Sequence, residues 1–298
     1  MLKLPLQSFF NPANWLRQTG LLVYLHTDGI NVIDALTGVE ATIASKNDIT
    51  AHMPTSFKSP SYKPESANDF NWQGAIEALT IKLALIKPKP KTPLRVVLSS
   101  DFVRYLLLPA QVVTLSNGEK NAYARAAFRQ LHGSIADKWQ IKCDNTAPHQ
   151  AAMLAAIDLQ LTQSLVQITD ENQLKLLSLT PYLMQVFNGI RKHLKLFNGY
   201  LVLVEGGRII LLNIKDGQID QLKSQFIADD WHMELNQTLD REQTLGHASS
   251  NNVIIYAPHH ETKLPFIKKG WSIDYVEQSP QGFMFSSNLN LSHLSAST

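Results

Sequence analysis

The fold is decided by the stretch GLLVYLHTDGINVIDAL (residues 20–36), in which two apolar, β-branched runs flank an Asp-Gly pair. Asp28-Gly29 between such runs predicts a β-hairpin, because the tightest hairpin turns need residues that tolerate positive φ. The pattern returns in GYLVLVEGGRIILLNI (residues 199–214), with Gly-Gly in place of Asp-Gly. The chain therefore contains an internal repeat, and each copy opens with a hairpin.

The same order of elements follows each hairpin. A third strand comes first, over residues 39–44 in one copy and 218–226 in the other. An amphipathic helix comes next, over about 70–86 with Asn68 or Asp69 as its cap, or over about 231–245 after an Asp-Asp pair. A short apolar strand closes each copy, over 94–98 or 253–256. The order strand-strand-strand-helix-strand thus occurs twice.

The sequence between the two copies predicts an inserted α+β segment. Ser116, with Glu119 three residues later, has the spacing of a capping box and predicts a helix that ends near His132. The remaining expected elements are strands over 102–108, 138–143, 150–156 and 174–179, a helix over 159–168, and a helix from Pro181 towards Leu196.

Composition limits the classes of function. The 298 residues are 44% apolar and 17% charged, which is typical of a globular protein. The net charge of +2 gives no electrostatic basis for nucleic-acid binding. One cysteine, Cys143, excludes an internal disulfide. The first residues lack the continuous apolar run of a secretory signal, and no run approaches the length of about 18 apolar residues that a membrane-spanning helix needs. These features predict a cytoplasmic protein.

The duplicated unit resembles the actin-like ATPase architecture, which is built from two ribonuclease-H-like lobes. The segment LSSDFVRYLLLPA (residues 98–110) is similar to the strand ending in Leu-Pro-Ala of the pilus and secretion assembly family that contains PilM and GspL. In that family a helix follows the Leu-Pro motif, as the helix ending at His132 does here. The strand that ends at Leu179-Thr-Pro181 also has a counterpart there.

The resemblance implies an α/β fold with two lobes. Residues 1–197 would form the first ribonuclease-H-like lobe, with an inserted α+β subdomain over about 100–170. Residues 198–298 would form the second lobe and a flexible C-terminal tail. By the same resemblance, the protein is expected to be a non-catalytic scaffold of a type IV pilus or type II secretion-like assembly. It would lie in the cytoplasm at the inner face of the inner membrane and dock the N-terminal tail of a bitopic inner-membrane partner. The resemblance leaves a homodimer open.

Actin-like ATPases hold the phosphates of ATP on the turns of the two lobe-opening hairpins, where backbone N–H groups surround the anion. By this resemblance the corresponding residues here are Asp28, Gly29, Glu205, Gly206 and Gly207. Both turns lack the expected run of small hydroxyl residues, since Ile30 follows one and Arg208 the other. A third element, the Gly-Gly pair on the adenosine side, is replaced by APHH (257–260). We interpret the site as vestigial, with no cofactor. The alternative is an ATPase of the same machinery that binds ATP and Mg²⁺.

No other constellation predicts catalysis. His259-His260-Glu261 has no further ligand at useful spacing for a metal, and an exposed loop explains it better. A ribonuclease-H-type nuclease needs carboxylates on the first strand, and residues 21–25 contain none. The cluster Arg191-Lys192-His193 with Lys195 fits the C-terminal end of a helix dipole, and leaves open a weak site for an anionic lipid or acidic partner. A sugar-kinase-like enzyme would need a catalytic carboxylate near the cleft, and the sequence offers no candidate.

Overall fold

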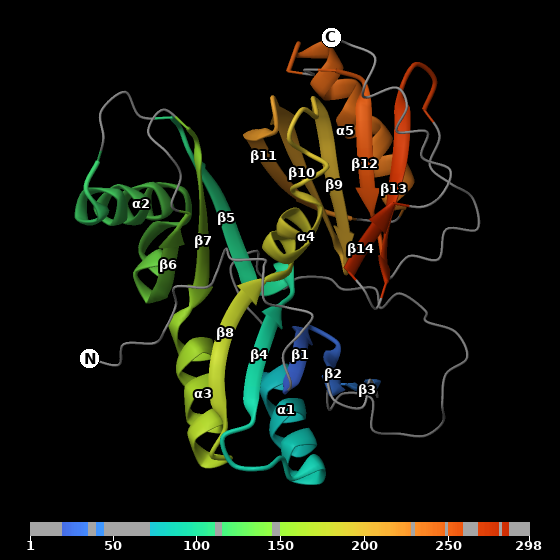
Figure 1. Cartoon of the computed structure of the whole chain (residues 1–298). Coiled ribbons are helices and arrows are strands. Elements are labelled where there is room, and N and C mark those ends of the chain that lie inside the picture. The colour runs from blue at the N-terminus through green and yellow to red at the C-terminus, as the bar shows by residue number, and fades with distance from the viewer. Residues whose placement is uncertain are drawn as a thin grey trace. The chain divides into compact units, whose positions relative to one another are not determined.

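The computed structural model describes residues 20–34, 40–44, 72–110, 115–144, 150–227, 230–247, 250–258, 268–279 and 282–285 (Figure 1). The strands are β1 Leu21–His26, β2 Gly29–Asp34, β3 Glu40–Ala44, β4 Pro93–Leu98, β5 Val103–Leu108, β6 Trp139–Cys143, β7 Ala152–Asp158, β8 Lys175–Pro181, β9 Gly199–Glu205, β10 Arg208–Lys215, β11 Gln218–Phe226, β12 Asn252–Tyr256, β13 Ser272–Ser279 and β14 Gly282–Phe285. The helices are α1 Gln73–Ile86, α2 Asn117–His132, α3 Leu159–Glu171, α4 Tyr182–Ile190 and α5 Trp231–Thr244.

The chain forms two compact units. The first contains the described residues up to Arg104 together with those of 117–142 and 155–185. The second contains the described residues of 105–116, 143–154 and 186–298. Each unit is built on one large sheet.

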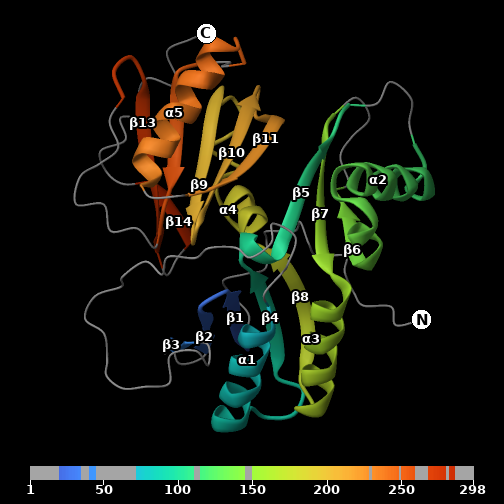
Figure 2. The ribbon, with the colours of Figure 1, turned by 180° about the vertical axis from the view of Figure 1, so that it is seen from behind.

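The first sheet has the strand order β3-β2-β1-β4-β8. β1 pairs antiparallel with β2 and parallel with β4, and β4 pairs parallel with β8. Helices α1 and α3 lie side by side against this sheet (Figures 1 and 2). Alternate residues of β1 are buried, which is the pattern of a strand with one face on the core.

The second sheet has the order β11-β10-β9-β12-β13-β14, so its first four strands repeat the arrangement β3-β2-β1-β4. β9 pairs antiparallel with β10 and parallel with β12. Helix α5 packs on this sheet through buried Trp231, Leu235 and Leu239 (Figure 2). Every residue of β9 is buried, because both faces of this central strand are covered. The predicted duplication of strand-strand-strand-helix-strand is therefore confirmed.

A matching glycine opens the first strand of each copy. Gly20 has φ +137° and Gly199 has φ +144°. A Cβ atom on Gly20 would lie 2.5 Å from the carbonyl oxygen of Pro93, and one on Gly199 would lie 2.3 Å from the carbonyl oxygen of Asn252. Pro93 and Asn252 are the first residues of the parallel partners β4 and β12. The same close approach of two backbones is therefore used at the same place in both sheets.

The inserted segment supplies a third sheet of order β5-β7-β6, together with α2 (Figure 1). Phe128 of α2 packs edge-on against Trp139 of β6, with ring centroids 6.0 Å apart. Both side chains are buried. The strands and helix predicted for this segment are present, with ends shifted by one or two residues.

Some predicted details are wrong. Helix α1 begins at Gln73 with Trp72 as N-cap and no side-chain cap, so the cap is neither Asn68 nor Asp69. The first hairpin turns at Thr27-Asp28, with His26 opposite Gly29, so Gly29 is the first residue of β2. Helix α3 extends beyond residue 168, whereas α4 ends well before residue 196. The predicted loop over 51–68 and the His-His-Glu segment at 259–261 lie outside the described residues.

Candidate functional site

The first candidate site lies where β1, β4 and β8 end. These three strands are parallel, and ligands of open α/β sheets bind at the carboxyl ends of such strands. Asp28 lies exposed in the turn just beyond β1, and Gly29 is buried behind it with φ 144°. The imidazole Nε2 of His26 lies 3.2 Å from the side-chain oxygen of Asn31 across the hairpin.

Burial favours the neutral form of the His26 imidazole. Burial lowers its pKa, and this effect outweighs the hydrogen bond with Asn31 and the charges of Asp28 and Asp101, which raise it. The ring of Tyr24 stacks on His26, with centroids 5.2 Å apart, and Tyr24 in turn contacts Tyr182, with centroids 5.0 Å apart. The first turn therefore presents an acidic residue and a neutral ring, and no cation.

The segment that follows β4 is fixed by its own hydrogen bonds. The backbone N–H of Ser99 donates to the carbonyl of Leu25 at 2.8 Å, and the Ser99 hydroxyl accepts from the backbone N–H of Asp101 at 3.2 Å. Arg104 donates from Nη1 to the carbonyl of Asp101 at 3.0 Å. His26 and Asp101 are neighbours that the sequence pattern did not predict. The available signal was that His26 ends the first strand of the hairpin and Asp101 comes shortly after the strand predicted over 94–98.

The second candidate site is the turn between β9 and β10. Glu205 and Arg208 face each other across Gly206-Gly207, and Gly206 has φ 54°, as the predicted tight turn requires. Glu205 is only 1% exposed. The guanidinium carbon of Arg208 lies 4.0 Å from the centre of the Phe226 ring, and Nη1 donates to the Ser224 hydroxyl at 3.4 Å. The structure therefore brings Glu205, Gly206 and Gly207 together in the second unit, whereas Asp28 and Gly29 lie together in the first.

A buried polar cluster beneath α5 has a structural role. Glu242 is 1% exposed and pairs with Lys223 of β11. The second carboxylate oxygen of Glu242 lies 3.5 Å from Nδ1 of His247, whose carbonyl accepts a hydrogen bond from Asn213 at 2.8 Å. Burial, and to a lesser degree the charge of Glu242, raises the pKa of Tyr200. These contacts join β9, β10, β11 and the end of α5.

Metal and nucleophile chemistry has little support. Within the described ranges, no three His, Cys, Asp or Glu side chains are grouped closely enough to hold a metal ion. Cys143 is half-buried, and its thiol lies 3.3 Å from the carbonyl oxygen of Asp144. No helix in the described part of the chain is both long and apolar enough to cross a bilayer.

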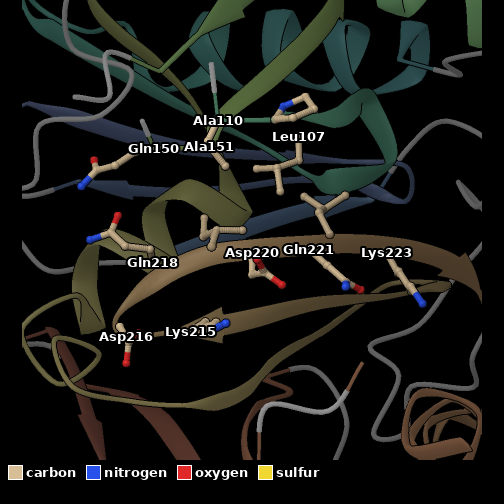
Figure 3. Close-up of a pocket in the computed structure, with 13 residues that line it drawn as sticks. Leu107, Ala110, Gln150, Ala151, Lys215, Asp216, Gln218, Asp220, Gln221 and Lys223 are labelled. Atoms are coloured by element: carbon tan, nitrogen blue, oxygen red, sulfur yellow. The ribbon is translucent and has the colours of Figure 1, made fainter. Parts of the chain in front are cut away.

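The second unit contains a cavity of about 650 Å³ (Figure 3). On one side lie residues from the end of β5 and the start of β7; on the other lies the β10–β11 hairpin. The lining includes Pro109 and Ala110, which belong to the Leu-Pro-Ala motif. The described lining residues are apolar, amide, lysine and aspartate side chains, and none is a histidine, cysteine or serine. This composition suits binding better than nucleophilic catalysis.

The two duplicated lobes, each a hairpin-led sheet with a covering helix, define the class of protein: the chain has the actin-like ATPase fold. The structure is similar to a Bacteroides thetaiotaomicron protein of actin-like ATPase fold and unknown function, with a TM-score of 0.51, 11% identity, and coverage of 83% of this chain and 84% of that one. It is also similar to a chain of the PilM-PilN type IV pilus biogenesis complex, with a TM-score of 0.52, 9% identity, and coverage of 81% and 82%.

A further similar structure is the cytoplasmic domain of EpsL, an inner-membrane component of the type II secretion system of Vibrio cholerae, with a TM-score of 0.48, 11% identity, and coverage of 87% and 89%. No protein-family model matches the sequence, and no curated protein matches it. The fold expected from the repeated hairpins is thus confirmed, including the likeness to pilus assembly proteins at the level of fold.

Proposed function

We propose that this chain is a non-catalytic scaffold of a type IV pilus or type II secretion-like assembly. It would act in the cytoplasm at the inner face of the inner membrane, where it binds the N-terminal tail of a bitopic membrane protein. The observation that supports this most is the likeness to a chain of the PilM-PilN complex over 81% of this chain. The lobe boundaries suggested by the sequence, 1–197 and 198–298, are part of the same proposal.

The chemistry of both hairpin turns argues against a triphosphate. At the first turn, Asp28 is a carboxylate with no cation at the turn, and the nearby imidazole of His26 is neutral. At the second turn, Glu205 buries a carboxylate beside Gly206-Gly207. The buried carboxylate of Glu205 would repel phosphate oxygens strongly unless a metal ion lay between them, whereas the exposed carboxylate of Asp28 would repel them weakly. The nearby arginine, Arg208, is already stacked on Phe226.

The cavity of the second unit is the surface that we propose for the partner peptide. β11 pairs with β10 on one side, and no other described strand pairs with its outer side. An extended peptide gains main-chain hydrogen bonds when it adds to such an edge, and it gains specificity from side-chain pockets beside it. Leu107 and Ala110 supply an apolar wall opposite the strand (Figure 3).

Two measurements test the proposal. Calorimetric titration with ATP, with and without Mg²⁺, is expected to show no binding; micromolar affinity would favour the ATP-binding alternative. A fluorescent peptide copied from the cytoplasmic tail of any bitopic membrane protein whose gene adjoins that of this chain is expected to bind, as measured by anisotropy. Ala110→Trp fills the cavity and should abolish binding. Leu196→Trp is the matched control, since Leu196 is 85% exposed and does not line the cavity. Equal binding by both variants would refute the assigned surface.

A further inference from the structure

The end of the first unit opposite the candidate site carries two adjacent loops. One connects α1 to β4 and contains Lys87-Pro-Lys-Pro-Lys91; the other connects α3 to β8. The backbone N–H of Lys91 donates to the carbonyl of Gln173 at 2.6 Å, and that of Lys175 donates to the carbonyl of Thr92 at 3.0 Å. The two loops therefore form one surface, at the lower end of the first unit in Figure 1.

This surface is positively charged. Lys87, Lys89 and Lys91 are exposed on the first loop, Lys175 is exposed at the start of β8, and Lys82 lies half-buried on the last turns of α1. Among the described residues, the acidic side chains beside them are Asp170 and Glu171 at the end of α3, and Glu171 accepts a hydrogen bond from Gln167 at 2.8 Å. Five lysines against two carboxylates give a local charge of +3, which exceeds the +2 of the entire chain. The rest of the molecule therefore sums to −1.

Large apolar side chains stand exposed next to these lysines. Leu85 is 70% exposed, Ile81 is 43% exposed and Ile86 is 39% exposed. Ile81 and Leu85 share one face of α1 because they are four residues apart. The opposite face of α1 is already buried in the unit through Leu79 and Leu83. Ile81, Leu85 and Ile86 therefore take no part in the core of the unit, and they lie next to the segment that contains Lys87 and Lys89.

The backbone places two of these lysines in a conformation that glycine adopts most readily. Lys87 has φ 48° and Lys91 has φ 64°, in the left-handed region that glycine adopts most readily. Lys87 ends α1, a position where glycine is the usual residue. Stability of the fold alone would favour glycine at both positions. The segment Lys89–Thr92 closes as a turn, in which the backbone N–H of Thr92 donates to the carbonyl of Lys89 at 3.1 Å and Pro90 fixes its own φ.

We propose that this surface binds the anionic phospholipids of a bilayer. We name it the basic tip, and its members are Leu85, Ile86, Lys87, Lys89, Lys91 and Lys175. Clustered lysines are attracted to anionic headgroups over about one Debye length, roughly 10 Å at moderate ionic strength. Leucine and isoleucine beside them enter the boundary between headgroups and acyl chains. Exposed apolar side chains favour a bilayer over a soluble polyanion, which would contact the lysines alone.

The test is co-sedimentation of the full chain with vesicles of phosphatidylcholine, with and without about one third phosphatidylglycerol. We expect binding to the anionic vesicles at about 0.1 M salt and its loss at about 1 M salt, where charges are screened within roughly 3 Å. The triple variant K87Q/K89Q/K91Q should lower the partition coefficient about 100-fold, since each lysine near the surface contributes about five-fold. Leu85→Gln should lower it by about five-fold and leave the salt dependence unchanged.

The matched control is K138Q/K215Q/K269Q, which removes the same charge from exposed lysines outside both basic clusters. It should keep most of the binding. Thermal unfolding followed by circular dichroism checks that each variant is folded. Binding to neutral vesicles as strong as to anionic ones, no binding to either, or equal losses in the two triple variants would each overturn the proposal. The inference does not depend on the proposed scaffold function.

Discussion

Gly199→Ala is expected to be among the most damaging single-methyl additions that this chain can receive. The new Cβ atom would lie 2.3 Å from the carbonyl oxygen of Asn252, whereas real Cβ contacts stay beyond 3.0 Å. The start of β9 and the start of β12 would have to separate by at least 0.7 Å, the difference of these two distances. Both strands lie at the centre of the second sheet, so the separation disturbs its core. A φ of +144° adds backbone strain of about 1–3 kcal/mol.

Together the strain and the clash predict a loss of about 3–5 kcal/mol in the free energy of unfolding. For a chain of this size this corresponds to a fall in Tm of roughly 6–15 °C. The measurement is thermal and urea unfolding, followed by circular dichroism. Hydrogen exchange of the β9 and β12 amides shows whether the loss lies in the second unit. Gly20→Ala, with a 2.5 Å approach to Pro93, should produce an equivalent loss in the first unit.

Gly207→Ala is the matched control, because nothing lies within 4 Å of its added Cβ and its φ is not positive. It should change stability by less than about 0.5 kcal/mol. Gly246→Ala separates strain from clash, since its φ is +68° but its surroundings are open. It should cost about 1 kcal/mol. If Gly199→Ala lowers the free energy of unfolding no more than Gly246→Ala does, the close approach of β9 and β12 at Gly199 does not limit stability, and the prediction is wrong.

Three further perturbations follow from single contacts. Lys223→Met removes the cation that pairs with the carboxylate of Glu242, which is 1% exposed, and should lower the free energy of unfolding by about 3 kcal/mol. Adding Glu242→Leu should recover most of this loss, as a double-mutant cycle of urea unfolding would show. The pKa of His26 is lowered in the folded state, so the folded protein is most stable above the pKa of the unfolded chain, about 6.5, and loses stability as pH falls below it. His26→Gln should therefore flatten the fall in Tm between about pH 7 and 5. An unchanged slope would contradict this. Asp230→Ala removes the acceptor for the backbone N–H of His232 at 2.9 Å and should cost about 1 kcal/mol, whereas Asp230→Asn should restore most of it.

Local pattern was enough to predict most elements of this fold. The hairpins, the helices α1 and α5, and the inserted strands follow from apolar periodicity and turn residues, which depend on neighbours in the sequence. Strand β11 matches its predicted range over 218–226. The errors fall where a distant contact competes with a local preference. Trp72 serves as N-cap of α1 because its indole is buried in the unit, while no capping side chain is used.

The candidate site was less predictable than the fold, because its members come from different strand ends. Asp101 acts on His26 only after β1 and β4 pair in parallel, and that pairing joins residues about 70 positions apart. The position of the first turn also depends on strand pairing and could not be predicted from the local sequence. Asp28-Gly29 fits a tight turn locally, yet the register of β1 with β2 places Gly29 opposite His26, within the ladder. Register depends on which face each strand buries, and this is a property of the sheet.

The duplication offers a comparison that bears on nucleotide binding. The residues opposite each other at the ends of the two hairpins are His26 and Gly29 in one copy, and Glu205 and Arg208 in the other. A phosphate held by both turns needs free N–H donors and no unshielded carboxylate at either. Here a carboxylate stands at each turn, exposed as Asp28 and buried as Glu205. Under the proposed non-catalytic function, Glu205→Gln alone should therefore still bind no ATP in the calorimetric titration. Binding by that single variant would show that one carboxylate is the whole barrier.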